Sequence, residues 1–118
     1  ANGTWTGDAY GKIQHHDNRM YIGIGSNGII FRESGTNRWE IDGNGHFIPS
    51  ANNTYDIGTT SNRVRNLYTN DLNLSNEGSN NSVDGTWGSY TIQEGEDDLF
   101  LINRRNGKKY KFNLTEVN

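Results

Sequence analysis

Turns rich in glycine and asparagine interrupt this chain every few residues, and the longest uninterrupted apolar run is Leu99–Ile102. Short apolar runs bounded by such residues are typical of short β-strands. Asn-Gly pairs readily supply the positive φ angles of tight hairpin turns. We therefore predict an all-β fold of short strands and hairpins with long loops.

The chain has little material for a hydrophobic core. Its 118 residues are one domain's worth, yet only 31% of them are hydrophobic and the mean hydropathy is -0.92. Such a composition usually indicates disorder, but three Trp, six Tyr and four Phe argue for a folded chain. A thin chain can bury its few apolar groups against copies of itself. We therefore expect an obligate oligomer.

Charge and residue usage argue against several classes of protein. A formal net charge of -3 is unsuited to a sequence-independent nucleic-acid binder. No apolar run approaches the roughly 20 residues of a membrane-spanning helix, so no membrane insertion is expected. With no cysteine there is no disulfide and no Cys-ligated metal. Because the first residue is Ala1 and not methionine, we expect a processed chain or part of a longer protein.

Three regions with different patterns follow one another. Residues 1–49 form a glycine-punctuated hairpin region, residues 50–82 a polar middle region, and residues 83–118 a C-terminal hairpin region. The middle region is expected to be loop up to Arg63. Residues 63–74 fit a helical or a strand pattern, and we favour an extended segment with one helical turn near Ser61–Asn66, because Asn and Thr are weak helix formers.

The first region is predicted to contain one short strand near Gly11–His15 and then two consecutive hairpins. Glycine-containing turns and a period-two alternation of polar and apolar residues support this assignment. The hairpin strands are expected at Met20–Ile24 with Ile29–Arg32, joined by Gly25–Gly28, and at Arg38–Asp42 with His46–Ile48.

The last region carries the strongest hairpin signal, Asn106-Gly107 between two strand-like runs. A two-residue loop would place Leu101 opposite Phe112. One strand face would then collect Leu99, Leu101, Tyr110, Phe112 and Leu114, and the other Phe100 and Ile102 beside Lys109 and Lys111. Both faces of Leu99–Ile102 need cover. A symmetry mate could supply it.

No catalytic motif is visible, so we predict a non-enzymatic protein with no cofactor. The histidines His15 and His46 are either solvated turn residues or, gathered three at a time on a three-fold axis, metal ligands.

The acidic cluster Glu94–Asp98 is interpreted as a charged turn between strands. A Ca²⁺ site and a glycosidase pair of acids are the alternatives.

Tryptophan and tyrosine side chains are the candidate receptor contacts, because an aromatic face suits the apolar face of a sugar ring. Trp87 and Trp5 lie in glycine-flanked stretches, where a large side chain either fills the interior of the fold or contacts a ligand. Trp39, inside an alternating strand, is expected to pack internally. Tyr90 is the third candidate receptor contact.

The segments N-T-Y-D-I-G at 53–58 and S-N-R-V-R-N-L-Y at 61–68 resemble a recurring segment near the C-termini of bacteriophage tail fibres and tailspikes. Trp39–Pro49 is similar to the strand pair that usually precedes it. The tail, from Val83 to Phe112, looks like the C-termini of marine-phage structural proteins. The resemblance covers about Arg38 to Val117. In many relatives a self-cleaving chaperone domain follows the motif, and no such chemistry is carried over here.

The resemblance implies an intertwined homotrimeric, fibre-like β-structure in the extracellular virion that attaches to a host surface glycan or protein. A purely structural shaft, trimerisation module or filament subunit is the alternative, and a fragment of a polysaccharide-degrading tailspike is the third possibility. The expected trimer interface comprises Tyr55, Ile57, Val64, Leu67, Leu72, Leu74, Phe100 and Ile102. Accordingly, Phe100→Asp or Ile102→Asp should disrupt assembly, and Glu96→Gln should have little effect.

Overall fold

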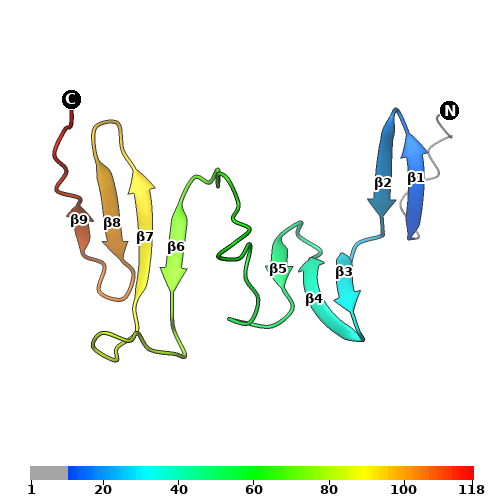
Figure 1. Cartoon of the computed structure of the whole chain (residues 1–118), viewed down its shortest axis with the longest axis horizontal. Helices are drawn as coiled ribbons and strands as arrows, with labels where there is room; N and C mark the ends of the chain where they lie inside the picture. Colours follow the sequence, from blue (N-terminus) through cyan, green and yellow to red (C-terminus); the bar gives the residue numbers. More distant parts are fainter. Residues whose placement is uncertain (1–10) are drawn as a thin grey trace. The chain divides into compact units, whose positions relative to one another are not determined.

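The computed structural model describes residues 11–118, and within this range the fold is all-β, with no helix, as predicted (Figure 1). Trp5 lies outside the described residues. Antiparallel strands form a two-stranded, a three-stranded and a four-stranded sheet. The chain divides into two compact units, one ending at Val64 and the other beginning at Arg65. The strands are β1 (Lys12–His16), β2 (Arg19–Gly23), β3 (Ile29–Glu33), β4 (Thr36–Ile41), β5 (Phe47–Pro49), β6 (Leu72–Ser75), β7 (Ser89–Glu94), β8 (Leu99–Asn103) and β9 (Lys109–Lys111).

Strands β1 and β2 form a hairpin around a two-residue turn. Asp17 and Asn18 both have positive φ, 50° and 60°, as the favoured two-residue hairpin turn requires. Ile13 lies opposite Ile22. The strand predicted near Gly11–His15 is therefore confirmed. The predicted pairing of the next strand with Ile29–Arg32 is wrong, because β2 pairs with β1.

The Gly25–Gly28 segment approaches the backbone beyond β4 instead of closing a hairpin. A Cβ atom on Gly28, where φ is 91°, would lie 2.0 Å from the carbonyl oxygen of Ile41. A Cβ atom on Gly43 would lie 2.8 Å from the carbonyl oxygen of Ser26. Here glycine permits a close approach of two backbone segments as well as a positive φ. Sequence patterns alone do not separate this use of glycine from a hairpin turn.

The three-stranded sheet has the order β3-β4-β5, and its β4–β5 pair confirms the second predicted hairpin. Aromatic side chains gather on one face. The Trp39 and Phe47 rings stack with centroids 5.0 Å apart, and Phe31 meets Phe47 edge-on at 6.4 Å. Trp39 is half-buried, whereas Phe31 and Phe47 are 46% and 57% exposed. The aromatic side chain on the central strand β4 is therefore half-buried, whereas those on β3 and β5 are largely exposed.

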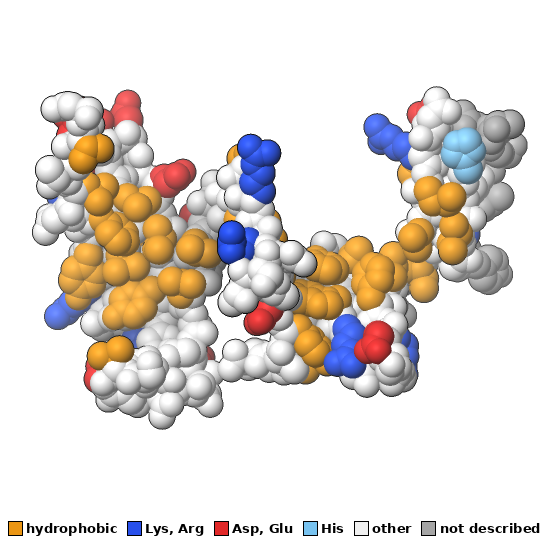
Figure 2. Space-filling view, viewed as in Figure 1, with side chains coloured by type: hydrophobic (Ala, Val, Ile, Leu, Met, Phe, Trp, Pro, Cys, Tyr) orange, Lys and Arg blue, Asp and Glu red, His pale blue; other side chains and the backbone are white. Residues whose placement is uncertain are grey.

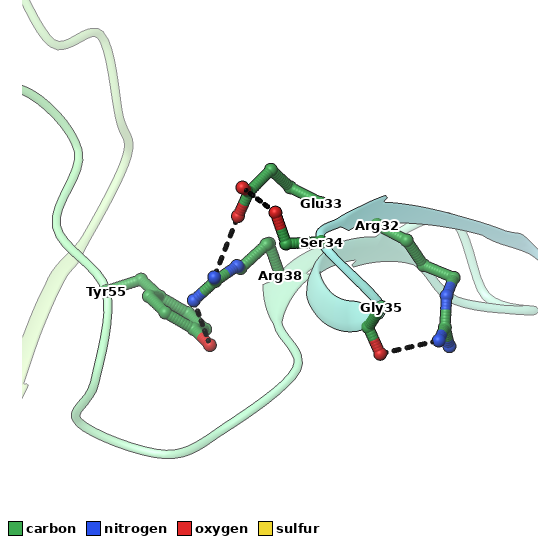
Figure 3. Close-up of polar contacts among 6 residues, drawn as sticks. All are labelled: Arg32, Glu33, Ser34, Gly35, Arg38 and Tyr55. Carbon is green, nitrogen blue, oxygen red and sulfur yellow. Dashed lines mark hydrogen bonds and ion pairs between the residues drawn. The ribbon is translucent and has the colours of Figure 1, made fainter.

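Arg38 of β4 links the loop after β5 to the three-stranded sheet through Tyr55 (Figure 3). Its guanidinium lies 2.8 Å from the Glu33 carboxylate and donates to the Tyr55 hydroxyl at 3.2 Å. The guanidinium carbon also lies 5.4 Å from the centre of the Tyr55 ring. Hydrogen bonds from the Ser34 hydroxyl and from Arg38 hold the pKa of Glu33 below its ordinary value.

The four-stranded sheet has the order β6-β7-β8-β9 (Figure 1). Residues 50–71 leading to it contain no strand and no helix, which confirms the expected loop and extended segment, whereas the helical turn expected near Ser61–Asn66 is absent. A line of apolar residues crosses all four strands where Leu72 pairs with Ile92, Ile92 with Leu101, and Leu101 with Tyr110.

The register of the last hairpin differs from the prediction by two residues. Leu101 faces Tyr110 and not Phe112. The loop has four residues, Arg104–Gly107, because the Asn103 N–H donates to the Lys108 carbonyl at 2.8 Å. The Asn103 carboxamide also accepts the Arg105 N–H at 2.9 Å, which stabilises the wider turn. A shift of two residues leaves every side chain on its predicted face.

One face of the four-stranded sheet is apolar and mostly half-exposed. Hydrophobic side chains gather over this sheet in Figure 2. We call this surface the apolar face; by alternation along the strands it comprises Leu72, Leu74, Tyr90, Ile92, Leu99, Leu101, Tyr110 and Phe112. Leu74 is 49% and Tyr110 47% exposed. Within its own unit, residues 65–118, no segment covers this face.

The opposite face is hydrogen-bonded and mainly polar, but it also carries Phe100 and Ile102. Thr91 is fully buried, donates to the Asn73 carboxamide at 2.6 Å and accepts the Arg104 Nε–H at 2.9 Å. Ile102, which pairs with Thr91, is 9% exposed. The best-packed part of the sheet is thus this face.

Candidate functional site

The loop between β6 and β7, residues 76–88, is held by its own side chains. Asn81 lies at its centre. The Asn81 Oδ1 atom accepts the backbone N–H groups of Val83 and Asp84 at 2.7 and 2.9 Å. Its Nδ2 atom donates to Asp84 Oδ1 at 2.8 Å. Such short side-chain to backbone bonds fix turn conformations.

Two further contacts close the loop. Asp84 Oδ1 accepts the Thr86 hydroxyl at 2.7 Å and the Thr86 N–H at 3.1 Å. The Thr86 hydroxyl, and then Asn81, hold the pKa of Asp84 below its ordinary value. At the base, Asn76 Oδ1 accepts the Gly88 N–H at 2.7 Å. The loop is therefore ordered before any ligand arrives.

The loop and the ends of β6 and β7 line an open hollow of about 470 Å³. It contains Trp87 and Tyr90, two of the three receptor contacts predicted from sequence. A Cβ atom on Gly88 would lie 2.9 Å from Cε2 of Tyr90, so the ring packs closely on the glycine. The lining residues are Leu74, Ser75, Asn76, Asn81, Asp84, Thr86, Trp87, Gly88 and Tyr90.

Arg105, from the β8–β9 loop, stacks on Trp87. Its guanidinium carbon lies 3.8 Å from the centre of the indole ring, and its Nη1 atom donates to the Trp87 carbonyl at 3.0 Å. Asn103 Nδ2 contacts the Tyr90 hydroxyl at 3.4 Å. A second hollow of about 350 Å³ on this side shares Trp87, Gly88 and Tyr90 with the first. We call the two hollows together the Trp87 site.

The Trp87 site combines half-buried aromatic rings with amide, hydroxyl and carboxylate groups. Ring faces contact the C–H groups of a saccharide, and the polar groups exchange hydrogen bonds with its hydroxyls. Sequence reasoning missed Asn81, Asp84 and Arg105. The first two carry a usable signal, an Asx pattern of short turns, whereas the position of Arg105 depends on the pairing of β7 with β8.

The residues expected at a trimer interface lie in three settings. Tyr55 is bonded to Arg38 within its own unit. Leu72 and Leu74 lie on the apolar face, whereas Phe100 and Ile102 lie on the opposite face. The remaining three lie in irregular segments and are largely exposed: Ile57 (68%), Val64 (52%) and Leu67 (75%).

The metal candidates are placed on different elements. His15 lies opposite Met20 in the β1–β2 hairpin, and His46 follows the turn after β4. In that turn the Asp42 carboxylate accepts the N–H groups of His46 and Asn44, which lowers its pKa. Within residues 11–118 no group of three His, Cys, Asp or Glu side chains is arranged to hold a metal ion.

The predicted acidic turn joins β7 to β8, but Glu94 is the last residue of β7 and the turn itself is Gly95–Asp98, closed by the Gly95 N–H donating to the Asp98 carbonyl at 2.8 Å. Its carboxylates lie outside both hollows of the Trp87 site.

No protein-family model matches the chain, and neither a curated protein nor a solved structure is significantly similar to it. Within the described residues, no helix has the length and apolar character needed to span a membrane.

Proposed function

We propose that this chain is a non-enzymatic domain at the distal end of a virion tail fibre, where three copies associate and attach to a glycan on the host surface. One observation carries the proposal. Ile102 is the only buried hydrophobic side chain in residues 11–118, while the two larger sheets, one in each unit, present apolar side chains that their own unit leaves partly uncovered.

Partly exposed apolar faces favour association with identical chains. Burying apolar surface contributes about 25 cal/mol per Å², and each copy would gain on both sheets. Single exposed hydrophobic residues are ordinary, but a continuous apolar face marks an interaction surface. An intertwined homotrimer would place the apolar face of each copy against the others.

The Trp87 site supplies the attachment function in this proposal. Its loop is held by internal hydrogen bonds, so ligand binding would lose little conformational entropy in ordering the loop. Trp87 and Tyr90 offer ring surface, and Asp84 and Asn76 offer polar groups at the same hollow.

A purely structural shaft or filament subunit is supported by the same apolar faces and differs only in lacking a ligand. Two measurements decide between these functions. Sedimentation should give the mass of three chains. A glycan array should show saccharide binding that Trp87→Ala abolishes and Tyr68→Ala, at a side chain 89% exposed outside the hollows, leaves unchanged. A trimer that binds no glycan would favour the structural role, and a compact monomer would refute both.

A further inference from the structure

Arg105 is a positioned cation without a carboxylate partner. Among residues 11–118, no acidic side chain forms an ion pair with it; the Arg38–Glu33 pair lies in the other unit. One of its N–H groups donates to the Trp87 carbonyl, and the other N–H donors make no hydrogen bond within the described chain. The guanidinium therefore keeps hydrogen-bonding capacity for a ligand.

Stacking on Trp87 fixes where these donors lie. The guanidinium carbon is 3.8 Å from the indole centre, within cation–π range, and the backbone bond at 3.0 Å restrains the head group further. A guanidinium held in this way matches the two oxygens of a carboxylate with two parallel N–H groups. Arg105 covers one face of the indole, so a sugar ring would contact the part of Trp87 that Arg105 leaves uncovered. Because Arg105 and Trp87 line the same second hollow, a substituent that enters this hollow would lie within reach of the guanidinium.

The opposite side of the site carries a negative charge. Asp84, an exposed carboxylate, lines the first hollow and not the second. The Trp87 site is therefore electrostatically divided, with the carboxylate of Asp84 in one hollow and the guanidinium of Arg105 in the other. A saccharide with one acidic group has a single favourable orientation in such a site.

We propose, resting on the glycan-binding function above, that the Trp87 site selects acidic saccharides and that Arg105 binds the carboxylate of a uronic acid. Trp87 and Tyr90 contact the sugar ring, and Arg105 determines the preference for acidic over neutral sugars. The same geometry orients the chain of sugars, because the acidic group enters the hollow that contains Arg105.

The test uses the full chain and matched pairs of probes. Tetrasaccharides of galacturonate, glucuronate and mannuronate are each compared with the carboxyl-reduced neutral form by calorimetry. For at least one pair, we expect the acidic form to bind roughly 10- to 100-fold more tightly, the range for one hydrogen-bonded charge. Arg105→Gln should remove this preference and retain neutral binding, while Arg105→Lys should retain part of it.

Arg104→Gln is the control, since it removes the same charge from the adjacent residue, whose side chain contacts Thr91 on the polar face. It should leave the acidic preference intact. Equal binding of acidic and neutral forms, or a preference that survives Arg105→Gln, overturns this inference while glycan binding stands. If neither member of any pair binds, glycan attachment at this site is overturned as well.

Discussion

Leu72→Asp should dissociate the proposed trimer while leaving the chain folded. Leu72 lies on the edge strand β6, 39% exposed, at one end of the apolar line that crosses the sheet. Full burial of a leucine side chain is worth roughly 1.5–3 kcal/mol, so the exposed remainder contributes about 0.6–1.2 kcal/mol per copy when a partner covers it.

In a trimer this loss of apolar burial occurs once in each of the three copies. The loss of apolar burial alone is about 2–3.5 kcal/mol, which weakens association roughly 20- to 400-fold. Burying three carboxylates in the assembly adds several kcal/mol each unless they find partners. Sedimentation velocity at micromolar concentration should therefore detect single chains.

Asn73→Asp provides the matched control. It adds the same charge one residue further along the strand, on the opposite face, and keeps an oxygen to accept the Thr91 hydroxyl. Circular dichroism should show β-structure in both variants. If Leu72→Asp remains trimeric, or if Asn73→Asp dissociates equally, the apolar face is not the surface that holds the copies together.

Three further results are expected. Gly28→Ala should lower the melting temperature of the first unit more than Gly35→Ala does. Both glycines have positive φ, but only at Gly28 would a Cβ atom meet the carbonyl of Ile41 in β4. Equal losses of melting temperature would show that the positive φ alone matters. Ordering of the loop by Asp84 should be complete above the unfolded pKa of about 3.9 and lost as pH falls through the lower folded pKa, so Trp87 fluorescence should change in acid, and that step should vanish in Asp84→Asn. Ile102→Asp should unfold the four-stranded sheet at a cost above the roughly 2–5 kcal/mol of a large-to-small core substitution; a folded variant that only loses its partners would place Ile102 at the interface instead.

The sequence predicts the faces of the C-terminal sheet better than its register. The predicted Leu101–Phe112 pair is off by two residues, because Asn103 widens the turn to Arg104–Gly107. Side chains alternate with a period of two, so this error moved no residue between faces. An error of one residue would have exchanged the two faces of the strand.

The pairing of β2 was less accessible to sequence reasoning. Gly25–Gly28 contains an Asn-Gly pair, whereas the true turn is Asp17-Asn18, and both sequences tolerate positive φ. The choice depends on the close approach of Gly28 to the Ile41 carbonyl, a contact between distant residues. Trp87 and Tyr90 could be chosen as candidates from their residue type alone. The position of Arg105 beside Trp87 depends on a contact between distant residues, so the sequence did not indicate it.

The apolar face and the Trp87 site meet at two residues. Leu74 and Tyr90 belong to the apolar face and also line the first hollow. The remaining lining residues come from the loop beyond the ends of β6 and β7, so copies that cover the strands would leave the loop at the rim of their contact. Cover over Leu74 would also exclude water from one wall of the first hollow and strengthen polar contacts there. Under the proposed function, assembly and attachment would be coupled, because a partner copy on the apolar face would also border the first hollow.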